Sequence, residues 1–126
     1  MGFQGDSQGR VIDPAAIEQL RALQGADEPD VLAELVEMYL ADTEPRIVEL
    51  RAAVGEGRLE DAGRAAHALA GGSAVFGAEP LISVCRQLQA AAREGDGASA
   101  PALVERLQEE YDRLRNALRR EIATDA

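Results

Sequence analysis

The sequence is short of the residues that build disulfide-linked, aromatic or β-rich proteins. Its 126 residues include one cysteine and no tryptophan, and only 3% are aromatic. One cysteine cannot form an intramolecular disulfide, and with no signal-peptide pattern at the start it predicts a cytoplasmic protein. No alternating β-branched run is long enough for a strand, and no apolar run approaches the roughly 20 residues of a transmembrane helix.

Positive charge is scarce as well. Lysine and arginine total 13 against 23 acidic residues, which gives a net charge of −10. Such a surface repels phosphate backbones and anionic lipid, so we expect neither nucleic acid nor membrane as a partner.

The sequence also lacks the patterns of several ligand sites. The chain has one histidine and one cysteine, and no His-x-x-x-His or Cys-x-x-Cys spacing, so we expect no metal. No glycine-rich nucleotide loop follows a strand, which argues against ATP binding and against kinase activity. We expect no cofactor.

Helix formers dominate what remains, and the apolar residues recur with helical spacing. Capping residues, prolines and glycines divide the chain into five expected helices, at about 13–24, 29–55, 59–75, 79–94 and 99–122. Pro45 is expected to bend or briefly break the second. Short connections favour antiparallel neighbours. The sequence thus predicts an all-α, up-down four-helix bundle with a short extra N-terminal helix, over residues 13–122, behind a flexible tail at 1–12.

Two further expectations concern the core. In the first helix Ile17, Leu20 and Leu23 share one face. In the fourth, the inward positions are Leu81, Val84, Cys85, Leu88 and Ala92. Because Cys85 lies on this apolar stripe, we interpret it as a core residue rather than a nucleophile.

The single histidine lies on the third helix, away from its core face. That face holds Leu59, Ala62, Ala66, Leu69 and Ser73. At about 100° per residue, His67 points roughly 140° away from the centre of that face, towards solvent. Its neighbours one and two turns away are Gly63, Arg64, Ala70, Gly71 and Ala74. Small residues here either clear the space above the imidazole or mark tight helix packing, and the pattern leaves both readings open.

An exposed imidazole has a definite chemistry. With an unperturbed pKa of about 6.5 it is largely neutral and nucleophilic near pH 7. It can therefore attack phosphorus and hold a phosphoryl group covalently. For such a carrier, it matters more that a partner's active site can reach the imidazole than that the carrier has a binding pocket of its own.

The residues around His67 resemble the signature of histidine phosphotransfer (HPt) domains. The matching run is Ala66-His67-Ala68-Leu69-Ala70-Gly71-Gly72-Ser73, followed by Gly77-Ala78. Leu81, Cys85 and Leu88-Gln89 resemble the next helix of that family, and residues 35–43 resemble the helix before the bend. The resemblance covers about residues 28 to 120.

This resemblance implies roles for individual residues. His67 would carry the phosphoryl group, Gln89 would hydrogen-bond the imidazole, Gly71 would keep the site open, and Gly77 would form the turn. Two positions depart from the family pattern, because Ala70 replaces a lysine that stabilises the phosphoryl group and Gly72 replaces a serine. Arg64, one turn before His67, is a candidate for the missing cation.

The resemblance also implies partners. They would be response-regulator receiver domains, a sensor histidine kinase, or both, with Mg²⁺ only in the receiver. The chain itself would be a monomeric phosphohistidine carrier rather than a turnover enzyme. One alternative is a docking module that binds a signalling partner without carrying phosphate. A second is a structural adaptor, dimeric through the last helix, which a contiguous apolar patch away from His67 would indicate.

Overall fold

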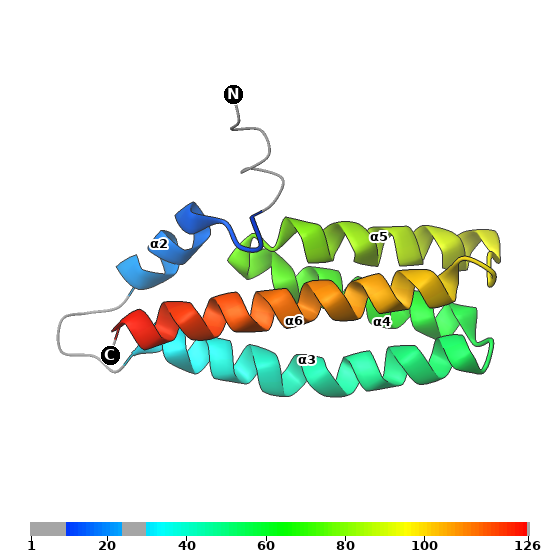
Figure 1. Cartoon of the computed structure of the whole chain (residues 1–126), viewed down its shortest axis with the longest axis horizontal. Helices are drawn as coiled ribbons and strands as arrows, with labels where there is room; N and C mark the ends of the chain where they lie inside the picture. The colour runs from blue at the N-terminus through cyan, green and yellow to red at the C-terminus, as the bar shows by residue number, and fades with distance from the viewer. Residues whose placement is uncertain (1–9, 24–29, 126) are drawn as a thin grey trace, which may run out of the picture.

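The computed structural model describes residues 10–23 and 30–125, and within these ranges it is helical without a strand. The helices are α2 (Pro14–Ala22), α3 (Val31–Gly55), α4 (Leu59–Ser73), α5 (Glu79–Glu94) and α6 (Ala100–Asp125), with a 3₁₀ turn, η1 (Ala74–Phe76), after α4. The four long helices lie side by side, and α2 sits at one end (Figure 1). The predicted all-α bundle is confirmed. No helix in the described ranges combines the length and apolar character that a membrane span requires.

One core runs the length of the bundle, and every helix contributes an apolar stripe to it. Tyr111 and Phe76 are its largest fully buried side chains. Ile17 and Leu20 extend it beneath α2. Val11 and Ile12, which were assigned to the tail, pack against this core, whereas residues 1–9 lie outside the described ranges.

Helix α3 runs through Pro45 without interruption. Its start is capped by Asp30, whose carboxylate accepts a hydrogen bond from the Ala33 amide at 3.0 Å. Proline leaves the carbonyl four residues earlier, that of Ala41, without its helical donor. Both Ala41 and Pro45 are exposed, so water can satisfy that carbonyl. The expectation of a break at Pro45 was therefore wrong.

Helix α2 is anchored at both ends. The Asp13 carboxylate caps it by accepting from the Ala15 amide at 3.0 Å, and the Asp13 amide donates to the Phe76 carbonyl at 3.0 Å. Near the other end, Arg21 pairs with Glu121 of α6 at 3.1 Å. Leu23 was expected in the core but is 70% exposed, because the helix ends at Ala22. The stop expected at residues 24–25 and the start expected at residue 29 lie outside the described residues.

The end of α4 differs from the sequence expectation. The α-helix stops at Ser73 rather than Val75, and the chain tightens into η1. Phe76 falls between the helices expected at 59–75 and 79–94, yet its side chain is fully buried in the core. Gly77 then takes a left-handed conformation with φ +61°, which directs the chain into α5.

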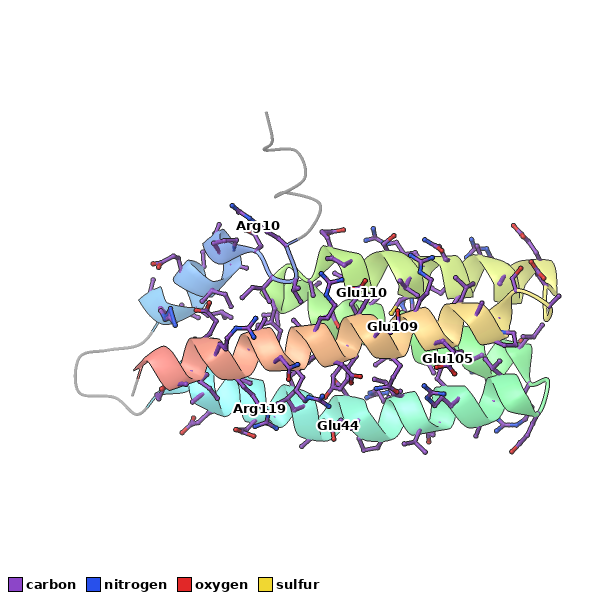
Figure 2. All side chains as sticks on the ribbon, viewed as in Figure 1. Arg10, Glu44, Glu105, Glu109, Glu110 and Arg119 are labelled. Carbon is purple, nitrogen blue, oxygen red and sulfur yellow. The ribbon has the colours of Figure 1, made fainter. Side chains whose placement is uncertain are left out.

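Polar contacts tie α3 to α6, and Figure 2 labels the two carboxylates involved, Glu44 of α3 and Glu105 of α6. The Tyr111 hydroxyl donates to Glu44 Oε2 at 2.8 Å, and Arg51 pairs with Glu105 at 3.0 Å. Burial and the Glu44 carboxylate raise the pKa of Tyr111, so the phenol stays protonated and keeps donating. These contacts join the middle of α3 to the facing part of α6.

Gly77→Ala should destabilise the fold for two separate reasons. A Cβ at this position would overlap the Cβ of Asp13, and the left-handed backbone costs a non-glycine residue about 1–2 kcal/mol. Gly57→Ala is the matched control, because Gly57 has φ +76° and no atom within 4 Å of an added Cβ. Chemical denaturation followed by circular dichroism should show a clearly larger loss for Gly77→Ala. Equal losses would mean that the Asp13 contact does not matter.

Candidate functional site

His67 lies on the outward face of α4, as predicted. Its side chain is exposed, whereas Ala62, Ala66, Leu69 and Ser73 on the opposite face are buried. Glu60 and Asp61 occupy the first turn of the helix, where carboxylates interact favourably with the helix dipole. The imidazole is thus presented to solvent from a helix that is held firmly along its other side.

Gln89 of α5 contacts the histidine ring. Its Nε2 lies 3.1 Å from Nδ1 of His67, so the sequence prediction that these two side chains touch is confirmed. A glutamine amide can present its oxygen or its NH₂ group to a ring nitrogen. In the structure the amide NH₂ faces the ring, and because an NH₂ group can only donate, Nδ1 accepts in this orientation. With the amide rotated, Nδ1 would instead donate to the amide oxygen. The contact fixes the direction of the ring and leaves its other nitrogen, Nε2, outside the contact with Gln89.

A shallow cleft between α4 and α5 surrounds the ring. Its lining residues are Glu60, Gly63, Arg64, His67, Gln89, Ala92 and Arg93. Sequence reasoning did not assign Glu60, Ala92 or Arg93 to the site. The signal for Arg93 was its spacing, because it lies four residues after Gln89 and therefore on the same side of α5.

The two open readings of the small residues apply to different glycines. A Cβ at Gly63 would lie 2.9 Å from the Cβ of Ala92, so Gly63 lets α4 and α5 approach closely. Ala92 was expected in the core, but Ala91 is buried there instead and Ala92 is half-buried beside Gly63. Gly71, in contrast, is exposed and has no atom within 4 Å of an added Cβ. Gly63 therefore serves helix packing. Gly71, two helical turns after Gly63, leaves open space on the same side of α4 as His67.

Arg64 is exposed near the ring but already has acidic partners. It forms a short contact with Asp61 and lies 3.9 Å from Glu60. Hydrogen bonding to Arg58, with a smaller contribution from Arg64, lowers the pKa of Asp61 and keeps this carboxylate ionised. Ala70, the position where the resemblance expects lysine, is half-buried and packs against the core.

A buried polar contact supports the end of α4. The Tyr39 hydroxyl and Ser73 Oγ lie 2.6 Å apart, and the Tyr39 ring meets Phe76 edge-on with 5.1 Å between centroids. Burial raises the pKa of Tyr39, so the phenol remains neutral. Gly72 passes this ring, which lies 3.8 Å from the position of an added Cβ. The contact holds the last turn of α4 in place beneath the exposed Gly71.

Cys85 and the acidic residues offer no second reactive site in the described part of the chain. Cys85 is fully buried, and burial raises its pKa to about 12, which confirms the core assignment. Among the described residues, no three His, Cys, Asp or Glu side chains are grouped as metal ligands.

Comparison with known proteins agrees with this geometry. The model of the Hpt domain family matches residues 34–117. Histidine-containing phosphotransfer protein B of Pseudomonas aeruginosa PAO1 superimposes with a TM-score of 0.80 and 28% identity, covering 90% of this chain and 95% of that one. A histidine-containing phosphotransfer protein of Medicago truncatula superimposes with a TM-score of 0.78 and 24% identity, covering 98% and 88%.

A search of the curated proteins found no matching sequence. The family match nevertheless covers two thirds of the chain, and the whole bundle shares its fold with these solved structures. The chain therefore belongs to the Hpt domain family and is a histidine phosphotransfer intermediate of two-component phosphorelays.

Proposed function

We propose that His67 is the residue that carries the phosphoryl group. The observation that supports this assignment is the exposed imidazole whose Nδ1 is held by Gln89 at 3.1 Å, with open space over Gly71. His67 is also the only histidine in the sequence. Gln89 is then a positioning residue, since it fixes the tautomer and the direction of the ring.

The transfer step uses the lone pair of Nε2. It attacks the phosphorus of an aspartyl phosphate on a receiver domain, and the N–P bond forms as the P–O bond to the aspartate breaks. The aspartate leaves as a carboxylate, and the ring proton stays on Nδ1, where Gln89 accepts it when its amide oxygen faces the ring. Passage to a second receiver reverses these bond changes. Mg²⁺ belongs to the receiver in this proposal, and the chain contributes the imidazole and the access to it.

The partners we propose are receiver domains of response regulators, a sensor histidine kinase, or both. The chain would act as a monomer. The exposed positions of α6 are mostly charged or polar, including Glu105, Glu109, Arg113, Asn116 and Arg119. Among the described side chains of α6, exposed apolar ones are few, so this helix offers a dimer little apolar surface to bury.

His67→Gln should abolish phosphoryl acceptance and leave the fold intact. Glutamine offers no nucleophilic ring nitrogen, and exposed substitutions usually change stability by less than about 0.5 kcal/mol. Incubation with a phosphorylated receiver, followed by detection of acid-labile phosphate, should label the wild type alone. Melting temperatures of the two proteins should agree closely. Phosphate uptake by the variant would show that another residue carries the group.

Gly71→Trp should block transfer by bulk. The added ring has room to project outward, because no atom lies within 4 Å of a Cβ at residue 71. Gly55→Trp is the matched control, since residue 55 is equally open but ends α3. Transfer rates from the same receiver should fall only for Gly71→Trp, while both variants remain helical. Normal transfer by Gly71→Trp would mean that the receiver approaches from another side.

A second role in docking is favoured by one observation, an apolar stripe on the outer face of α3. Met38 and Val48 are 68% and 67% exposed, and Ala41, Pro45 and Ala52 lie between and beyond them on the same side. The buried residues of α3, such as Leu40 and Ile47, lie on the opposite side. An exposed stripe of this kind is what a docking partner would cover, and its end approaches α4, because Ala52 lines a hollow together with Arg64.

Met38→Glu tests that role. A charge in the middle of an apolar contact should weaken binding of a receiver or kinase partner, measured by calorimetry, if the partner covers α3. Asn116→Glu adds the same charge on exposed α6 as a control. If Met38→Glu and the control bind the partner with equal affinity, α3 is not a docking face. Partner binding would then involve the surface around His67 alone.

A further inference from the structure

A phosphorylated His67 would meet an unfavourable charge environment. The phosphoryl group adds close to two negative charges at neutral pH. The chain already carries a net charge of −10, and all of its 13 basic residues are arginines. Because Ala70 is uncharged, the helix that bears His67 supplies no cation at that position. Any compensating charge must come from an arginine that reaches the cleft.

Two arginines line the cleft, Arg64 and Arg93. The charge of Arg64 is already compensated, because Asp61 and Glu60 both lie within ion-pair distance. A phosphoryl group would have to compete with two carboxylates on the same helix for this guanidinium. Arg64 therefore contributes little additional attraction.

Arg93 is in a different position. It is exposed, and among the described residues it forms no ion pair, while the Glu60 carboxylate that lines the same cleft lies 3.9 Å from Arg64. The acidic residue one turn further along the chain, Asp96, is occupied by Ser99, whose hydroxyl and amide donate to its carboxylate at 2.7 and 3.1 Å. Those two hydrogen bonds also lower the pKa of Asp96. The guanidinium of Arg93 is thus available to an incoming anion.

The geometry of α5 brings Arg93 towards the reacting nitrogen. Residues four apart on a helix are neighbours, with Cβ atoms about 5–6 Å apart. Gln89 touches Nδ1 of His67, and Arg93 lines the same cleft one turn later. A long guanidinium side chain at that place can reach a phosphoryl group on Nε2 and bind two of its oxygens at once.

We propose that Arg93 is the phosphoryl-binding residue of this site, so that the cation comes from α5 rather than from the helix that carries the histidine. This inference rests on the proposed function of His67. Arg93 acts once the N–P bond exists, by pairing with the phosphoryl oxygens. It should shift the equilibrium of the relay towards the phosphorylated bundle and slow hydrolysis of the phosphohistidine.

The test compares variants of the whole chain against one phosphorylated receiver. Arg93→Ala should lower the equilibrium share of phosphoryl on this chain about two- to five-fold, the range for an exposed ion pair. Arg93→Lys should retain most of that share, and Ala70→Lys in the Arg93→Ala background should restore it. The difference between wild type and Arg93→Ala should shrink at high salt.

Arg106→Ala is the matched control. Arg106 is exposed on α6, donates to Gln87 and lies outside the residues that line the cleft. A wild-type share for Arg93→Ala would overturn the proposal, and so would an equal loss for Arg106→Ala, which would indicate an effect of overall charge. Unlabelled wild type would instead overturn the carrier role of His67. Thermal unfolding of all variants should coincide, because each altered side chain is at the surface.

Discussion

The close approach of α4 and α5 is the constraint on which the rest of the site depends. Gly63 and Ala92 leave room for no additional carbon between the two helices, since an added Cβ would come within 2.9 Å of the alanine methyl group. At this separation the short amide of Gln89 reaches the imidazole of His67. A larger side chain at residue 63 would move α5 outward and break that contact. The orientation of the nucleophile is thus determined by a packing contact one turn away from it.

The glycines of α4 have different effects on stability and on the space beside His67. Each glycine in a helix interior costs about 1 kcal/mol relative to alanine. At Gly63 this cost is offset by the close contact with α5. At Gly71 no neighbouring atom offers an equivalent gain, and the cost is matched there only by the open space that the proposed function assigns to a partner. The buried Tyr39–Ser73 contact holds the same end of the helix, which keeps that space open without loosening the fold.

The positions of the charged side chains describe the site better than the net charge of the protein does. The net charge is strongly negative, yet the acidic residues beside the histidine on α4 are already engaged with Arg58 and Arg64. On α5, Arg93 lines the cleft, and the Asp96 carboxylate three residues later accepts two hydrogen bonds from Ser99. A phosphoryl group on His67, as proposed, would therefore find at the cleft one cation, Arg93, that pairs with no described carboxylate. The net charge still disfavours other polyanions.

The sequence by itself determined the helices, the bundle and the direction of His67, because helical periodicity specifies which residues share a face. The spacing of the family motif also placed Gln89 beside the ring. Only the tertiary structure decided what each face meets. It exposed Leu23 and the apolar stripe around Met38, buried Phe76, and assigned Gly63 to packing and Gly71 to access. Whether Arg93 is free to bind an anion likewise depends on contacts between helices and on the turn that Asp96 and Ser99 form. The residue pattern along one helix contains no information about either.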